Sequence, residues 1–160
     1  MVLLENIIID QYTQNKIDLN KLNIADHLLL TLANFTAELF PNVTTYVGSQ
    51  QQAVETPALF VNFYSIDNRQ KVIDLSEYEF GIEITYVPQN ELSTVELNGA
   101  VFQIQQNLYK LQSDIGEFIC YNKSSDITDG LAHVTGTIKA LEITLPNEDI
   151  IKIANKELII

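Results

Sequence analysis

The chain has few of the residues on which redox and nucleotide chemistry depend. Cys120 is the single cysteine among 160 residues, so neither an intrachain disulfide nor an all-cysteine metal site can form. A lone cysteine agrees with a reducing compartment. The six glycines are scattered singly, and none belongs to a glycine-rich phosphate-binding loop. We therefore expect no nucleotide cofactor.

Positive charge is also scarce. Lys and Arg number 9 against 21 Asp and Glu, which gives a formal net charge of -12. A surface of this sign repels nucleic-acid phosphates, so we expect no sequence-specific nucleic-acid partner. No run of about 18 apolar residues occurs, which predicts no membrane span. The opening MVLLENIIID also lacks the basic leader and the small-residue cleavage site of a signal peptide.

The strongest structural signal is a long hairpin over residues 57–87. Its first strand follows Pro57, and a polar turn is predicted at Asp67 to Arg69. The second strand alternates strictly, which predicts one buried face and one acidic outer face. The inward set is Tyr78, Phe80, Ile82, Ile84 and Tyr86, and the outward set is Glu77, Glu79, Gly81, Glu83 and Thr85.

Two segments have the spacing of amphipathic helices. Residues 24–39 place apolar side chains at steps of three and four, with Asn20 or Asn23 as the N-cap and Pro41 after the end. A second helix is predicted to begin at Ser93, because Ser93 and Glu96 are spaced as a capping box. Its apolar positions are Leu97, Val101, Ile104, Leu108 and Leu111.

Further strands are predicted at residues 43–47 and 117–121, which are short, and at residues 131–145, with a turn-rich connection over residues 122–130. These elements predict an α+β fold in a single domain, residues 1–160. We expect a mainly antiparallel β-sheet with two amphipathic helices packed on one face. Residues 1–20 and 147–160 are interpreted as N- and C-terminal extensions.

Few residues are candidates for catalysis. His27 lies between apolar helical positions, His133 alternates within a strand, and Cys120 sits in an apolar strand, so all three are interpreted as structural. Asp126 and Asp129 lack the ligand spacing of a calcium loop and are interpreted as turn residues. We expect no metal site and no cofactor.

The strand carboxylates are the one exception that requires a test. Acidic side chains on a sheet face can hold magnesium in nucleases, and the candidates here are Asp74, Glu77, Glu79 and Glu83. Such nucleases carry a lysine two residues after the second acid, where this chain has Thr85 after Glu83. A surface acidic stripe is the preferred interpretation. A metal-dependent hydrolase using Asp74, Glu79 and Glu83 stays open as an alternative.

The order of elements carries a resemblance to a known family. A helix ending at Phe40-Pro41 precedes a short strand and a loop into ETPALFV (residues 55–61), then a polar turn and a long strand ending in Ile84-Thr85-Tyr86. An amphipathic helix, a turn at Asp126 to Gly130 and a final long strand follow. Over about residues 24–145 the chain resembles the tail terminator, or tail completion, proteins of tailed bacteriophages and of phage-tail-like bacteriocins.

This resemblance implies a structural role. Members of that family are not enzymes; they form hexameric rings that cap the tail tube, stop its growth and provide the surface to which the head connector or collar docks. The implied partners are other copies of the chain, the tail tube and possible sheath proteins, and the head connector. The implied location is the bacterial cytoplasm during assembly and then the proximal end of the tail. A neck or head-tail connector protein of the same particle is the alternative.

If a ring forms, contacts between subunits or with partners are expected in four places: the loop after the short strand, the polar turn, the acidic strand and the apolar C-terminal tail. The candidate residues are Gly48, Gln50, Gln51, Glu55, Asp67, Arg69, Glu79, Glu83, Ile150, Ile151, Ile153 and Leu158.

Overall fold

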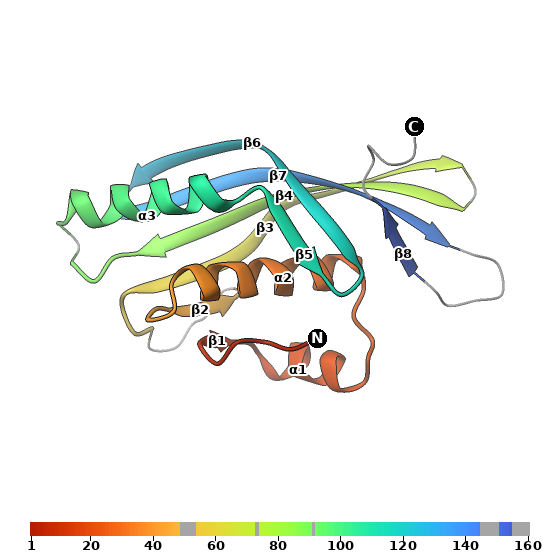
Figure 1. Ribbon diagram of the computed structural model, residues 1–160, viewed down its shortest axis with the longest axis horizontal. Coiled ribbons are helices and arrows are strands. Elements are labelled where there is room, and N and C mark those ends of the chain that lie inside the picture. Colours follow the sequence, from red (N-terminus) through yellow and green to blue (C-terminus); the bar gives the residue numbers. More distant parts are fainter. Residues whose placement is uncertain (49–53, 73, 91, 145–150, 155–160) are drawn as a thin grey trace.

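The computed structural model contains one curved sheet with helices on one of its faces (Figure 1). The structure describes residues 1–48, 54–72, 74–90, 92–144 and 151–154. Its elements are, in chain order, β1 (Ile7–Ile8), α1 (Gln11–Asp18), α2 (Ile24–Leu39), β2 (Thr44–Val47), β3 (Ala58–Val72), β4 (Leu75–Val87), α3 (Thr94–Asn107), β5 (Lys110–Ser113), β6 (Gly116–Thr128), β7 (Leu131–Thr144) and β8 (Ile151–Ala154).

The strands follow the order β1-β2-β3-β4-β7-β6-β5, and β8 pairs with the end of β7. Pairs from β3 through β5 are antiparallel, as predicted, whereas β1 with β2 and β2 with β3 are parallel. The α+β class is confirmed. The N-terminal segment adds a strand and a third helix, α1, to the two predicted helices. None of the described helices is long and apolar enough to cross a membrane.

The core lies between the sheet and helices α2 and α3. The alternation predicted for β4 is confirmed, because Phe80, Ile82 and Ile84 are fully buried. Burying a side chain of this size stabilises the fold by about 1.5–3 kcal/mol. The helices contribute Leu28, Leu32, Leu97 and Ile104, and the neighbouring strands contribute Leu59, Val61, Phe118, Val134 and Ile138.

Two segments predicted as turns are in fact strands. Asp67 to Arg69 lie within β3, which continues to Val72, and they pair with β4 instead of turning. Residues 122–128 belong to β6, so the turn between β6 and β7 is only Asp129 and Gly130, with φ values of 55° and 74°. These values suit an Asp-Gly hairpin turn. Polar composition suggested turns here, but both strands are exposed and tolerate polar side chains.

Helix α3 ends at Asn107, one turn earlier than predicted, and Leu111 lies in β5 while still packing into the core. A bulge near Asn122, which has a φ of 51°, shifts the register of β6 against β7. Beside it, Lys123 Nζ donates to the Gln105 carbonyl at 2.8 Å. This cation lies at the C-terminal turn of α3, where carbonyls lack helical partners.

The connection from β4 to α3 depends on Glu96. Ser93 caps the helix as predicted, but the Glu96 carboxylate does not complete a capping box. It accepts instead from the Tyr86 hydroxyl at 2.9 Å and from the backbone N–H of Gln89 at 2.7 Å. A reciprocal capping box does occur at α2, between Asn23 and Asp26. Glu96 thus ties the helix to the end of the central strand.

We predict that Gly136→Ala destabilises the fold by about 1–3 kcal/mol, because a β-carbon there would overlap the buried Cys120 Sγ. In a Cys120→Ala background the same substitution should have less than half this effect. Urea unfolding of the four variants measures the coupling. Gly99→Ala is the control: no atom lies near its β-carbon position, so it should stabilise α3 slightly. Equal effects in both backgrounds would contradict the overlap.

A second prediction concerns alkaline pH. Burial and the hydrogen bond to Glu96 raise the pKa of Tyr86 from 10.0 to about 12. The folded state therefore favours the neutral phenol, and this contribution to stability is complete below about pH 10 and is lost as pH rises toward 12. Tyr86→Phe should remove this part of the pH dependence, measured as unfolding free energy against pH. Tyr12→Phe, at an exposed site, should leave it in place.

Candidate functional site

The face of the sheet opposite the helices is the candidate interaction surface. Because paired residues in antiparallel strands point to the same side, the register defines rows across this face. One row runs Asn62, Glu83, Thr135 and Ser124, and the next runs Phe60, Thr85, His133 and Asp126. These rows cross β3, β4, β7 and β6, so this surface is built from four strands.

Glu83, Thr85 and His133 form a polar cluster in these rows. The Thr85 hydroxyl donates to Glu83 Oε1 at 3.2 Å and lies 3.2 Å from His133 Nδ1. His133 Nδ1 also lies 3.6 Å from Glu83 Oε1. The cluster borders a shallow hollow lined by Ser124, Ser125, Asp126, Thr128 and Thr135.

Toward the far end of the β3–β4 hairpin the face carries charges of both signs. Asp67, Glu79 and Lys139 form one row there, and Arg69, Glu77 and Leu141 form the next. The prediction that Glu77 faces solvent is wrong: the residue is only 6% exposed, and its carboxylate lies 3.6 Å from Lys71 Nζ. Arginine and lysine from neighbouring strands thus interrupt the acidic stripe.

The carboxylates of the hydrolase hypothesis are not brought together. Glu79 and Glu83 are four residues apart on one strand, so their α-carbons lie about 13 Å apart. One ion needs its oxygen ligands within about 2.0–2.6 Å. Asp74 precedes β4, five residues before Glu79. Among the described residues, no group of three or more His, Cys, Asp or Glu could hold a metal ion.

The remaining candidate nucleophile, Cys120, and candidate base, His27, lie away from the polar cluster. Cys120 is buried, as predicted, and burial raises the pKa of its thiol to about 11, so the unreactive protonated form dominates at neutral pH. His27 lies on α2, where burial lowers the pKa of its imidazole and Asp114 partly opposes this shift. Cys120 faces the core and His27 lies on α2, whereas the polar cluster lies on the opposite face of the sheet. Neither residue therefore forms a nucleophile–base pair with the cluster.

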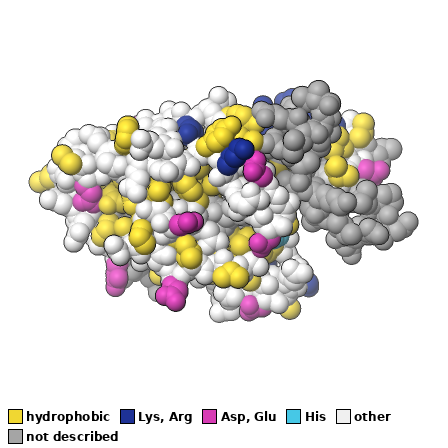
Figure 2. Space-filling view, in the orientation of Figure 1, with side chains coloured by type: hydrophobic (Ala, Val, Ile, Leu, Met, Phe, Trp, Pro, Cys, Tyr) yellow, Lys and Arg dark blue, Asp and Glu magenta, His cyan; other side chains and the backbone are white. Residues whose placement is uncertain are grey.

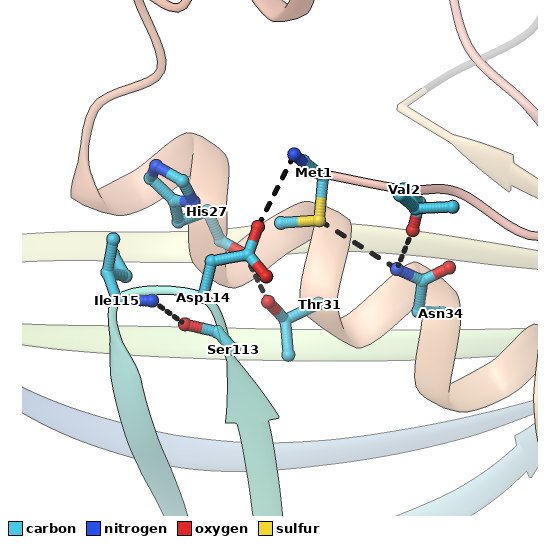
Figure 3. Close-up of polar contacts among 8 residues, drawn as sticks. All are labelled: Met1, Val2, His27, Thr31, Asn34, Ser113, Asp114 and Ile115. Atoms are coloured by element: carbon cyan, nitrogen blue, oxygen red, sulfur yellow. Dashed lines mark hydrogen bonds and ion pairs between the residues drawn. The ribbon is translucent and has the colours of Figure 1, made fainter.

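Asparagine side chains and one ion pair hold the N-terminal segment against α2, which was not predicted (Figure 3). Asn34 on α2 donates to the Val2 carbonyl and accepts from the Leu4 N–H, each at 3.1 Å. The amino group of Met1 lies 3.4 Å from Asp114 Oδ2, near His27. Asn6 donates to the carbonyls of Ala37, Phe40 and Val43 and so caps the C-terminus of α2. The Asn6 and Asn34 amides bond backbone groups 30 or more residues away, which no local sequence pattern predicts.

The predicted interface residues lie in different parts of the molecule. Gly48, with a φ of 81°, follows β2, and Glu55 is exposed before β3. Asp67 and Arg69 are exposed on β3, while Glu79 and Glu83 are half-buried on β4. Ile151 and Ile153 belong to β8, which pairs with β7. Gln50, Gln51, Ile150 and Leu158 lie outside the described residues.

Comparison with known proteins gives one finding. A protein-family model described as "Phage tail terminator protein" matches residues 20–150. The match runs from just before α2 to beyond β7 and therefore includes the whole open face of the sheet. No curated protein matches the chain.

The separation of the carboxylates generates a further prediction. Calorimetric titration with magnesium or manganese should give no saturable heat, because a site needs its ligands around one point. Glu83→Gln should leave the titration unchanged. Saturable binding in the natural protein that Glu83→Gln abolishes would instead restore the hydrolase hypothesis. Glu55→Gln, at an exposed site outside the acidic strand, is the matched control.

Proposed function

This chain belongs to the phage tail terminator family and is a structural protein of phage tail assembly, and from this we propose that it forms a ring that caps the tail tube. The ring terminates tube growth and offers the docking surface for the head connector or collar. Its partners are further copies of the chain, the tail tube and the head side of the particle. Subunits assemble in the bacterial cytoplasm, and the ring then occupies the proximal end of the tail.

The observation that carries this proposal is the family match over residues 20–150, which takes in both core helices and the long strands. The two core helices cover one face of the sheet, and the long strands carry the polar rows described above on the other face. That face holds exposed or half-exposed polar side chains such as Glu83 and His133. Polar, mixed-charge surfaces of this kind suit reversible assembly with neighbours more than burial in a core.

The chemistry of the candidate residues also supports a non-catalytic role. Glu79 and Glu83 stand far apart on one strand, and the Cys120 thiol is buried and protonated. The family itself is one of structural proteins. In addition, a ring of subunits with a net charge of -12 each would present a negative channel, through which a polyanion such as DNA passes without adhering.

We expect the purified protein to assemble. Light scattering coupled to size exclusion should give a mass that is a multiple of the 18.1 kDa subunit, with a hexamer as the expected ring. Added to polymerising tail tube protein, the ring should shorten tubes and appear at one end in electron micrographs. A protein that stays monomeric at high concentration and leaves tube length unchanged would contradict the proposal.

The C-terminal tail permits a finer version of this experiment. Residues 151–154 form β8 on the subunit's own sheet, so a chain ending at Ala154 keeps this strand and removes only residues 155–160. If the apolar tail contributes to the interface, this truncation should lower the assembled mass while circular dichroism stays unchanged. An unchanged mass would remove residues 155–160 from the interface.

A further inference from the structure

We propose that the face of the sheet opposite the helices receives a lysine or arginine side chain from a basic segment of the protein onto which the ring docks. The site, called the polar hollow, is the hollow beside the polar cluster, with Glu83 and His133 on one side and Asp126 on the other. The inference rests on the proposed function and deepens it, because it assigns the chemistry of the partner. That partner is a protein other than this chain.

The polar hollow lies where three strands run side by side. β4 contributes Glu83, β7 contributes His133 and β6 contributes Asp126 to its lining, and its volume is about 380 Å³. From the strand spacing and the register, the α-carbons of Glu83 and Asp126 lie about 12 Å apart. This separation is too wide for one metal ion to bind both carboxylates. It leaves room between them for a guanidinium or an ammonium group.

The polar hollow offers free hydrogen-bond acceptors. The Thr85 hydroxyl and His133 Nδ1 both contact Glu83 at Oε1, and the Thr128 hydroxyl donates to Asp126 Oδ2. Within the described parts of the chain, Glu83 Oε2 and Asp126 Oδ1 therefore have no partner. Lysine and arginine head groups carry several donors and no acceptor. They complement a site of this kind better than any other side chain.

The charge around the polar hollow is negative and has no cation close by. The two rows of paired residues that hold it contain two carboxylates and no lysine or arginine. Lys139 is four residues beyond Thr135 on β7, which is about 13 Å. Lys123 is near in sequence, but its Nζ lies on the Gln105 carbonyl of α3. An incoming cation therefore meets attraction here without a competing side chain.

Charge also decides between a second copy and another protein. Each copy carries a net charge of -12, so an acidic site repels further copies as well as nucleic acid. A basic protein segment is attracted instead. In the view of Figure 2, carboxylates are spread singly over the surface, so the overall charge draws a basic partner in without fixing where it binds. The polar hollow supplies the fixed point.

A tyrosine beside the polar hollow provides an aromatic contact. The pairing of β3 with β4 is irregular between Phe63 and Ser65, where Tyr64 lies. A β-carbon on Gly81 would overlap the Tyr64 ring, so this ring lies on the same face as Glu83, two residues further along β4. The ring is 57% exposed. Tyrosine is enriched at protein interfaces, and its face attracts the cationic groups of arginine and lysine.

Histidine signals in NMR spectra test the site directly. The chain has two histidines, so the Cε1–H signal of His133 reports on the polar hollow and that of His27, on α2, is an internal control. Titration with the peptide acetyl-Gly-Arg-Gly-amide should shift the His133 signal saturably and leave the His27 signal in place. The same peptide with citrulline in place of arginine has no charge and should give no saturable shift.

Matched variants separate the polar hollow from general attraction. Glu83→Gln and Asp126→Asn should each weaken peptide binding by about fivefold, the upper range for an exposed ion pair. Glu55→Gln removes the same charge from an exposed position before β3 and should leave the binding constant unchanged. Equal weakening by all three variants would mean that net charge alone attracts the peptide, and the inference would fail. It would also fail if the His133 signal showed no saturable shift.

Assembly measurements distinguish failure of this inference from failure of the proposed function. The double variant Glu83→Gln/Asp126→Asn should keep the assembled mass of the natural protein but bind the tail tube or the head connector more weakly. A lower mass would mean that the polar hollow lies between copies, which overturns the inference and leaves the ring. Unchanged binding to both partners would overturn it too. A natural protein that neither assembles nor caps tubes overturns the proposed function, whereas the peptide titration still decides whether the polar hollow binds a cationic side chain.

Discussion

The pairing of β4 with both of its neighbours is the constraint on which the rest of the structure depends. This strand is matched to β3 on one side and to β7 on the other along nearly its whole length. The side chains of Phe80, Ile82 and Ile84 therefore point to the helix-covered face of the sheet. Those of Glu79, Glu83 and Thr85 point to the opposite face. A slip of one residue would exchange the two sets and bury the carboxylates.

Local patterns predicted this part of the fold well. The period of two in β4 and the spacing of apolar residues in α2 are both properties of short stretches of chain, and so is the cap at Asn23. Longer-range features were not predictable. Glu77 is buried beside Lys71, and Glu96 accepts from Tyr86 in place of its own N-cap, because in each case the partner belongs to another element.

The turn assignments went wrong for a different reason. Asp67 to Arg69 and residues 122–128 are polar, and polarity was interpreted as a break in the sheet, but a strand exposed on its surface needs no apolar side chains to pair. For the candidate site, the residue chemistry indicated only an acidic α+β protein. The family match then supplied the structural role. The four-residue spacing of Glu79 and Glu83 along β4 argues against the metal alternative.

The lengths of the outermost strands determine how much of each sheet margin is paired, and this bears on solubility. The outer strands are short: among the described residues, β2 pairs with Ala58–Val61 of β3 and β5 pairs with Gly116–Ile119 of β6, so the rest of these two long strands has one open side. Long open margins invite strand addition from other molecules and thereby amyloid-like association. The exposed charged side chains of Asp67, Arg69 and Asp126 lie on these open stretches, where charge opposes uncontrolled sheet extension.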